Sequence, residues 1–197
     1  FAENMRELSR FLQSRGRKRT VIFQMSNRET LAYFDELERN HISFDWRWFV
    51  PYEYNSFIYP DKARQRREMR QYLLPFVKRA ILEAGADSVI FNNLDVMVAF
   101  YDICRELELT IPEDLTAVAV EDYSRLQNYG DCAVSALQYP WSELGRKMVG
   151  CFLDPYFHPE SIVCRPVFTE RESSRRGAGN PAGIGVDIPA VSNNGVL

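Results

Sequence analysis

The sequence predicts an α/β domain in which a parallel sheet carries helices on both faces. Two short apolar runs, residues 88–91 and 115–120, flank a segment from Asp95 onward whose apolar residues recur at helical spacing. A strand, a helix and a strand in this order form a βαβ unit, and its two strands run parallel through a right-handed crossover. The apolar positions of the helix are Met97, Ala99, Phe100, Ile103 and Leu107.

Each strand of this unit runs into a polar segment. Asn92, Asn93 and Asp95 follow the first strand, and Glu121 and Asp122 follow the second. In an open parallel sheet, ligands bind in the crevice outside the carboxyl ends of the strands. Adjacent strands lie about 5 Å apart. The two polar segments are therefore expected to face one another and to form a binding site.

The residues before this unit predict further strands and helices. Gly16 fits the position after the first helix, and Pro75 is expected to kink or break the third helix. Trp46 and Trp48 would share one face of an aromatic strand, because side chains alternate along a strand. The expected helices cover residues 2–15, 28–39 and 61–84, and the expected strands cover residues 20–25 and 45–54.

Beyond residue 123 the sequence predicts a strand at 134–137, a helix at 142–153 and an edge strand at 162–169. Ser142 is a suitable N-cap for the helix. Pro166 favours an edge position for the last strand, because proline cannot donate to a hydrogen-bond ladder. Pro112 is expected to stop the central helix. We find no internal repeat.

Composition sets few limits on function. The 197 residues suffice for one sizeable domain, 46% of them are hydrophobic, and the net charge of −3 neither favours nor excludes nucleic acid. Residues 1–80 are rich in Lys and Arg, and residues 81–160 in Asp and Glu. This asymmetry fits a solvated surface, or a field that steers an anionic partner. The basic stretch 62–70 is expected to be a solvated helix face rather than a DNA contact.

Cysteine usage and hydropathy indicate in which cellular compartment the protein is located. The four cysteines are scattered and form no CxxC motif, which favours reduced thiols and a cytosolic protein. No apolar run reaches transmembrane length. The sequence begins with Phe1 and shows no signal-like stretch, so we expect a fragment of a longer protein.

Several segments, in the same order, resemble the effector-binding core of LacI/GalR-type transcriptional regulators. The central unit contains Pro112-Glu113-Asp114 and ends its second strand in an acidic pair, here Glu121-Asp122. The sequence departs from the family in two places: Leu94 stands where the family has an asparagine, and Glu121 where it has an aspartate. The other matching segments are the basic turn 15–19, the strand and hinge at 135–145 and Arg171-Glu172-Ser173-Ser174.

The resemblance implies a receptor of the periplasmic-binding-protein-like type I fold, in which two α/β lobes clamp a small molecule. It assigns residues 1–137 and 162–174 to the C-terminal lobe, and residues 138–161 to a hinge and a helix of the missing N-terminal lobe. Residues 175–197 are expected to be a flexible tail. The implied partners are a sugar-like effector, a second copy in a homodimer, and operator DNA through an absent N-terminal headpiece. No cofactor, metal or membrane is implied, and the location would be cytoplasmic.

Eight residues are candidate effector contacts. Carboxylates accept hydrogen bonds, asparagines both donate and accept, arginine can fork to a ligand, and tyrosines stack on sugar faces. Structural alternatives remain open. They are a helix N-cap for Asp95, which is favoured, a helix N-cap or loop contact for Glu121, turn positions for Asn92 and Asn93, and a surface ion pair for Arg28. The candidates are Arg28, Tyr52, Tyr54, Asn92, Asn93, Asp95, Glu121 and Gln138.

Two other functions compete with effector sensing. Asp95, Glu121 and Asp122 could hold Mg²⁺ in an enzyme, but the sequence has no phosphate loop, GxSxG or GxGxxG motif. A secreted solute-binding protein would have the same fold. Without its natural partner lobe, the helix at 142–153 is expected to make an intermolecular contact, because its apolar stripe would otherwise stay in water. The stripe consists of Leu144, Met148, Val149 and Phe152.

Overall fold

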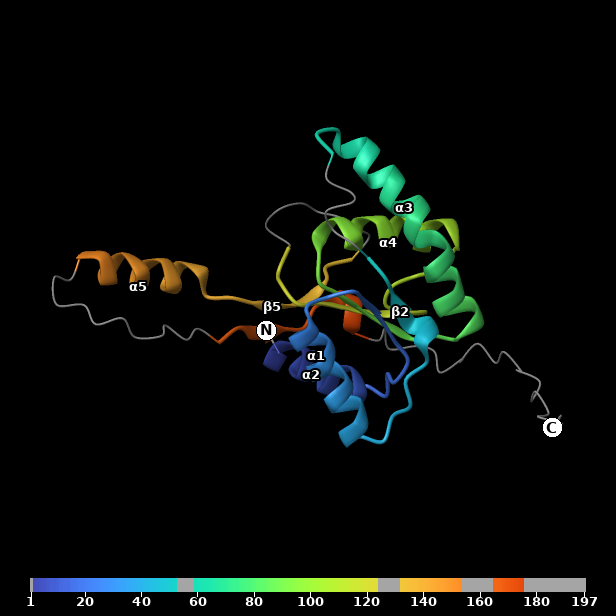
Figure 1. Ribbon diagram of the computed structural model, residues 1–197, viewed down its shortest axis with the longest axis horizontal. Helices are drawn as coiled ribbons and strands as arrows, with labels where there is room; N and C mark the ends of the chain where they lie inside the picture. Colours follow the sequence, from blue (N-terminus) through green and yellow to red (C-terminus); the bar gives the residue numbers. More distant parts are fainter. Residues whose placement is uncertain (1, 53–58, 124–131, 154–164, 176–197) are drawn as a thin grey trace.

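A mostly parallel sheet organises the fold (Figure 1). The computed structural model describes residues 2–52, 59–123, 132–153 and 165–175. Within them the strand order is β2-β1-β3-β4-β5-β6; all neighbouring pairs are parallel except β5 and β6, which are antiparallel. The predicted α/β class is confirmed. The strands are β1 (Thr20–Phe23), β2 (Phe49–Val50), β3 (Ser88–Phe91), β4 (Thr116–Ala119), β5 (Ser135–Gln138) and β6 (Val167–Thr169).

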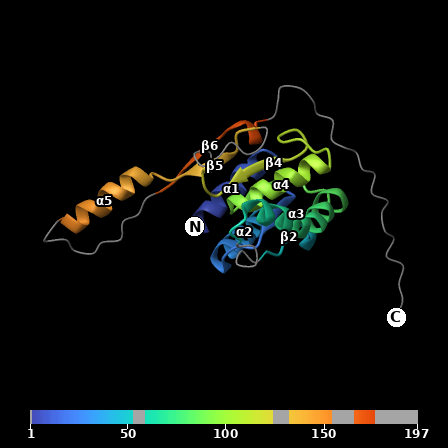
Figure 2. The same cartoon turned by 90° about the horizontal axis from the view of Figure 1, so that it is seen from above.

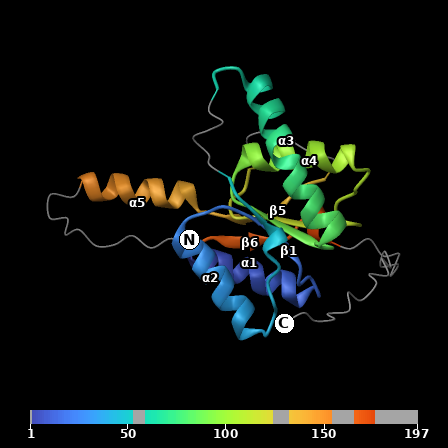
Figure 3. The same cartoon turned by 45° about the vertical axis from the view of Figure 1, so that its right-hand side comes forward.

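Helices cover both faces of the sheet, as Figure 3 shows. α1 and α2 pack on one face, and α3 and α4 on the other. No helix in the described part of the chain is both long and apolar enough to cross a membrane. The helices are α1 (Ala2–Ser14), α2 (Asn27–Arg39), α3 (Lys62–Lys78), α4 (Leu94–Glu106) and α5 (Trp141–Leu153), with short turns η1 (Trp46–Trp48), η3 (Arg79–Glu83) and η4 (Glu172–Ser174).

The central strands are apolar on both sides, which explains why they are parallel and doubly covered. β1, β3 and β4 are buried along their whole length. Because side chains alternate along a strand, successive residues enter different cores. Phe23, Phe91 and Ala119 pack with α3 and α4, whereas Ile22 and Ile90 pack with α1 and α2. Full burial of one such large side chain stabilises the fold by about 1.5–3 kcal/mol.

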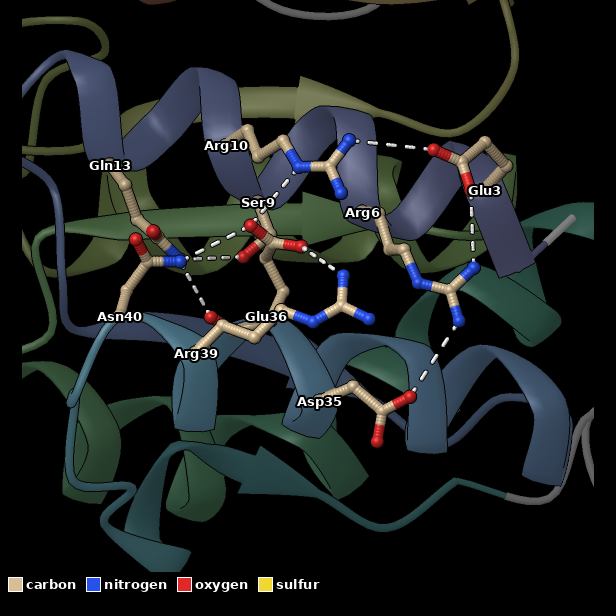
Figure 4. Close-up of polar contacts among 9 residues, drawn as sticks. All are labelled: Glu3, Arg6, Ser9, Arg10, Gln13, Asp35, Glu36, Arg39 and Asn40. Carbon is tan, nitrogen blue, oxygen red and sulfur yellow. Dashed lines mark hydrogen bonds and ion pairs between the residues drawn. The ribbon is translucent and has the colours of Figure 1, made fainter.

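A buried carboxylate joins α1 to α2 (Figure 4). The side chain of Glu36 is only 5% exposed. Its Oε1 accepts hydrogen bonds from Arg10 Nε at 3.1 Å and from Asn40 Nδ2 at 3.2 Å, and Arg39 lies 3.7 Å from its Oε2. Burial opposes ionisation of Glu36, but the hydrogen bond and charge of Arg10, with help from Asn40 and Arg39, lower its pKa. A second set of ion pairs joins the same two helices: Arg6 lies 3.1 Å from Glu3 and 3.6 Å from Asp35.

The predicted aromatic strand at 45–54 is mostly wrong. The Asp45 carboxylate accepts the Arg47 backbone N–H at 2.9 Å and caps η1, so of the described residues 45–52 only Phe49 and Val50 join the sheet. The turn also separates the two tryptophans: Trp46 is 69% exposed, whereas Trp48 is 7% exposed. Their predicted common face is therefore wrong as well. A capped turn satisfies its own backbone groups locally, and this overrides the strand preference of the aromatic residues.

Neither Pro112 nor Pro75 breaks a helix, although the helix predicted for residues 61–84 is confirmed as α3 and η3. α4 ends at Glu106, where the Leu107 N–H caps it, well before Pro112 and its cis peptide bond. α3 continues through Pro75 and passes into the π-turn η3. Gly16 follows α1 with a φ of 74°, as expected for a residue that ends a helix.

α5 stands apart from the rest of the described chain (Figures 1 and 2). It begins at Trp141, so the predicted cap Ser142 lies inside the helix. None of its residues is buried, and Phe152 is 86% exposed. The returning strand β6 lies at the sheet edge, as Pro166 predicted, while residues 162–164 of the expected strand and residues 176–197 of the expected tail lie outside the described residues.

We expect replacement of Glu36 by Gln to lower the free energy of unfolding by about 1–2 kcal/mol, because Arg10 and Arg39 lose a charged acceptor. The loss should be largest near neutral pH. The Glu36 carboxylate stabilises the folded state above its unfolded pKa of about 4.3, and this contribution disappears as the pH falls through the lowered folded-state pKa.

Urea unfolding between about pH 3 and pH 7 measures this effect. Glu38→Gln is the matched control, since Glu38 is exposed on the same helix. A Glu36→Gln penalty that stays constant across this range would contradict the assignment.

Candidate functional site

The carboxyl ends of the parallel strands meet at one edge of the sheet. We call this edge the carboxyl rim. The register pairs Phe91 with Ala119, and the Val120 N–H donates to the Phe91 carbonyl at 2.9 Å. The next residues, Asn93 and Glu121, therefore follow neighbouring strands on the same edge. The rim consists of Gln24, Asn92, Asn93, Glu121, Asp122 and Gln138.

The two asparagines after β3 have different roles. The side-chain carbonyl of Asn93 accepts the backbone N–H groups of Asp95 at 2.8 Å and Val96 at 3.3 Å, so Asn93 is the N-cap of α4. Asn92 Nδ2 donates to the backbone carbonyl of Gln24 at 2.9 Å. The side-chain carbonyl of Asn92 is buried and has no partner within the described residues. The Asn92 side-chain carbonyl is thus a buried acceptor beneath the rim that no described group satisfies.

The favoured cap role of Asp95 is wrong, because Asn93 occupies that position two residues earlier. Asp95 lies in the first turn of α4 instead. Its carboxylate accepts Gln65 Nε2 at 2.7 Å, and Gln65, which is buried in α3, also accepts Lys62 Nζ at 3.0 Å. Gln65 was not predicted as a site residue, because an amide on an otherwise charged helix gives no specific signal in the sequence.

Glu121 and Asp122 are neighbours in sequence but differ in their contacts. Arg171 forms a bidentate ion pair with Asp122, with Nη1–Oδ1 at 3.1 Å and Nη2–Oδ2 at 2.7 Å. Gln138 Nε2 donates a further hydrogen bond to Asp122 Oδ2 at 2.8 Å. These three side chains, which we call the clasp, join the loop after β4 to the strand that leaves for α5 and to the segment after β6. Glu121 has no ion pair or hydrogen bond within the described residues.

The remaining candidates lie around the β1 end of the rim. Arg28 is exposed in the first turn of α2 and has no ion-pair partner in the part of the chain that the structure describes. Tyr52 is buried, and its backbone N–H donates to Gln24 Oε1 at 3.2 Å. Tyr54 lies outside the described residues. Gln24 was missed because the strand was predicted to continue to residue 25, whereas β1 ends at Phe23.

The charge of Glu121 acts on two further tyrosines, Tyr123 and Tyr139, which were not predicted as site residues. Burial raises the pKa of Tyr123, and the charge of Glu121 raises it further. Burial also raises the pKa of Tyr139; a hydrogen bond from Asn4 opposes this, and the charges of Glu121 and Glu29 add to it. Asn4 Nδ2 donates to the Tyr139 hydroxyl and so ties α1 to the segment that leads to α5.

The rim does not fit the alternative in which Asp95, Glu121 and Asp122 hold Mg²⁺. Asp95 accepts from Gln65, and Asp122 is neutralised by Arg171. Among the described residues no three His, Cys, Asp or Glu side chains gather in a way that could hold a metal ion. The rim therefore presents polar side chains at the carboxyl ends of the strands without a gathered set of metal ligands.

Solved structures share this fold. The transcription regulator CcpA of Lactococcus lactis matches with a TM-score of 0.65 and 17% identity, over 87% of this chain and 61% of that chain. A PurR-family transcriptional regulator from Vibrio parahaemolyticus matches with a TM-score of 0.68 and 14% identity, over 89% and 63%. The regulator CelR in complex with cellobiose matches with a TM-score of 0.65 and 15% identity, over 88% and 52%.

At these identities the matches establish the fold, which is that of the effector domains of LacI- and PurR-type transcriptional regulators. The chain spans less than two thirds of each of those three solved chains. No family model matches the sequence, and no curated protein matches it.

We expect Asn93→Ala to lower the free energy of unfolding by about 1 kcal/mol, because two N–H groups of α4 lose their acceptor. Asn93→Asp should keep the stability, since a carboxylate also caps a helix and interacts favourably with its dipole. Thermal unfolding of both variants measures this. Equal loss in the two variants would show that the side chain acts through something other than the cap.

Arg171→Met should lower the free energy of unfolding by about 2–3 kcal/mol, because it leaves the largely buried Asp122 carboxylate without its cation. The double variant Arg171→Met with Asp122→Asn should recover part of this loss. Arg67→Met, an exposed change on α3, is the control. An Arg171→Met variant that is as stable as the Arg67→Met control would refute a stabilising role of the clasp.

Proposed function

We propose that this chain is the C-terminal effector-binding lobe of a two-lobed transcription regulator. The effector would be a small, sugar-like molecule, and the protein would act without bond-breaking chemistry. The fold match supports the receptor class, and the acceptors of the carboxyl rim support a ligand that donates hydrogen bonds. CelR, which shares the fold, is described in complex with cellobiose.

One observation carries the proposal. α5 leaves the lobe from Gln138, at the carboxyl rim, and none of its residues is buried. Its uncovered apolar side chains, including Val149 at 57% and Phe152 at 86% exposure, would not stay in water in a finished protein. A second body that covers α5 would sit close to the rim. This position supports the proposal of a clamp that closes on a ligand.

The proposed division is the one that the family resemblance implies. Residues 1–137 and 162–174 would form one lobe, residues 138–161 would provide a hinge and a helix for the other lobe, and 175–197 would form a tail. Arg28, Tyr52, Tyr54, Asn92, Glu121 and Gln138 remain proposed effector contacts. Asn93 and Asp95 would act mainly by holding α4 at the rim, since Asn93 caps α4 and Asp95 joins α4 to Gln65 of α3.

The mechanism is a population shift between two dimer geometries. An effector that binds better to the closed clamp favours one geometry, and helix-turn-helix headpieces on a segment N-terminal to this sequence then fit or miss their operator half-sites. The proposal implies a homodimer located in the cytoplasm, where the operator DNA is.

The test uses the longer protein that contains this chain. DNA fragments that it retains from its own genome serve as operator probes, and a library of sugars and sugar derivatives is screened by thermal shift. We expect at least one compound to raise the Tm and to change operator affinity by about tenfold or more. Glu121→Ala should abolish the thermal shift, and Glu113→Ala, an exposed control in the turn before β4, should not.

A protein that binds a sugar but retains no DNA would instead be a solute-binding protein with this fold. A protein that binds no compound in the screen and whose DNA binding is unaffected by all of them would contradict the proposal.

A further inference from the structure

The connector between β5 and α5 is tied back to the lobe at two side chains. It consists of Gln138, which is the last residue of β5, and of Tyr139 and Pro140; α5 begins at Trp141. α5 itself stands apart from the lobe, and none of its residues is buried (Figure 2). The contacts of this connector therefore determine, on the outgoing side of the chain, at which residue α5 can turn relative to the lobe.

The first anchor is the clasp. Gln138 Nε2 donates to Asp122 Oδ2 at 2.8 Å, and Arg171 holds the same carboxylate through two hydrogen bonds at 3.1 Å and 2.7 Å. Arg171 is also fixed independently of Asp122. Its Nη1 donates to the Val134 carbonyl at 2.6 Å, and its backbone N–H donates to Ser135 Oγ at 2.7 Å. The side chains of Arg171 and Asp122 are only 17% and 13% exposed, so water competes little for these charge-assisted bonds.

The second anchor holds the next residue from the side of α1. Asn4 Nδ2 donates to the Tyr139 hydroxyl, across 135 residues of sequence. Asn4 is 7% exposed, and its neighbours Met5 and Leu8 are fully buried in the core between α1, α2 and the sheet. α1 cannot follow a movement of α5 without disturbing this core. Tyr139 therefore stays with the lobe as long as this hydrogen bond is made.

Beyond Tyr139 the contacts belong to α5 or are local. The Pro140 carbonyl accepts the N–H groups of Glu143 at 3.0 Å and Leu144 at 2.9 Å, so it is part of the first turn of the helix. The proline ring fixes φ of Pro140, which leaves rotation about ψ of Tyr139 and ψ of Pro140 between the anchor and the helix. Trp141 spans this joint: its N–H donates to the Tyr139 carbonyl at 2.8 Å, and its ring stacks on the Tyr139 ring with centroids 5.1 Å apart. Trp141 is 56% exposed, so water can replace both contacts when the joint turns.

We propose that Asn4 and Asp122 are positioning residues that fix Gln138 and Tyr139 to the lobe, and that α5 pivots at Pro140. A hinge is formed by a few residues at the end of an element that absorb the change in φ and ψ, and a turn at Pro140 spares both the core and the two anchors. The joint itself does not depend on effector sensing. Under the proposed function, on which this consequence rests, the hinge begins at Pro140 rather than at Gln138. The Gln138 side chain then stays at the carboxyl rim whichever way the second lobe turns.

Backbone ¹⁵N relaxation of the full 197-residue chain locates the pivot. The sample is kept at a concentration at which sedimentation shows a monomer, because pairing through α5 would restrain the helix. We expect Ala136, Gln138 and Tyr139 to have order parameters of about 0.85, as in the rest of the sheet, and residues 142–152 to have values below about 0.6. The step between the two values should lie at Pro140.

Two substitutions test the anchors. The double variant Asn4→Ala with Gln138→Ala removes both anchors and leaves the ion pair of the clasp in place. We expect the order parameter of Tyr139 to fall to that of α5, and to fall part of the way in each single variant, which keeps the test if the double variant is poorly folded by thermal unfolding. Gln13→Ala is the matched control, because it removes an amide from α1 whose partner, Ser9 Oγ, lies in the same helix. It should leave Tyr139 rigid.

Three results would overturn the inference. They are a Gln138 and Tyr139 that already move as freely as α5 in the unmodified chain, order parameters without a step at Pro140, and a Tyr139 that stays rigid when both anchors are removed. None of them bears on whether the longer protein binds an effector, so effector sensing is tested separately by the sugar screen.

Discussion

The structure depends on strands that run in the same direction and are buried on both faces. β1, β3 and β4 are apolar on both sides, so each needs a helical layer above and below. Parallel neighbours require a crossover connection, and the crossovers α2, α3 and α4, together with α1 before β1, supply the two layers. The same arrangement brings every carboxyl end of the parallel strands to one edge. The position of the candidate site is thus a consequence of core packing.

The sequence was sufficient for the parts of the fold where one strong pattern dominates. The apolar runs at 88–91 and 115–120 with a periodic segment between them predicted the βαβ unit correctly. The prediction failed where local hydrogen bonds compete with side-chain preference. Asp45 caps a turn in a segment whose aromatic residues favour a strand, and the placement of Trp46 in solvent could not be inferred from alternation.

The position of the carboxyl rim could be predicted from the sequence, but the structural role of each polar side chain at the rim could not be predicted. Asn93 and Asp95 are separated by one residue, and either side chain could cap a helix; the backbone conformation at Asn93 decided between them. The partner of Asp122 is Arg171, 49 residues later, and only the return of the chain to the sheet brings it there. Tyr139 carries no motif, and its position follows from the contact with Asn4.

The antiparallel pairing of β5 and β6 has a mechanical consequence. One strand carries the chain away from the sheet and the other brings it back, and their register joins Gln138 to Val167. Two connectors that are hydrogen-bonded side by side resist being pulled apart or slid past each other. Because β5 is also paired with β4, whatever lies beyond these two strands is anchored to the sheet through a continuous hydrogen-bond ladder.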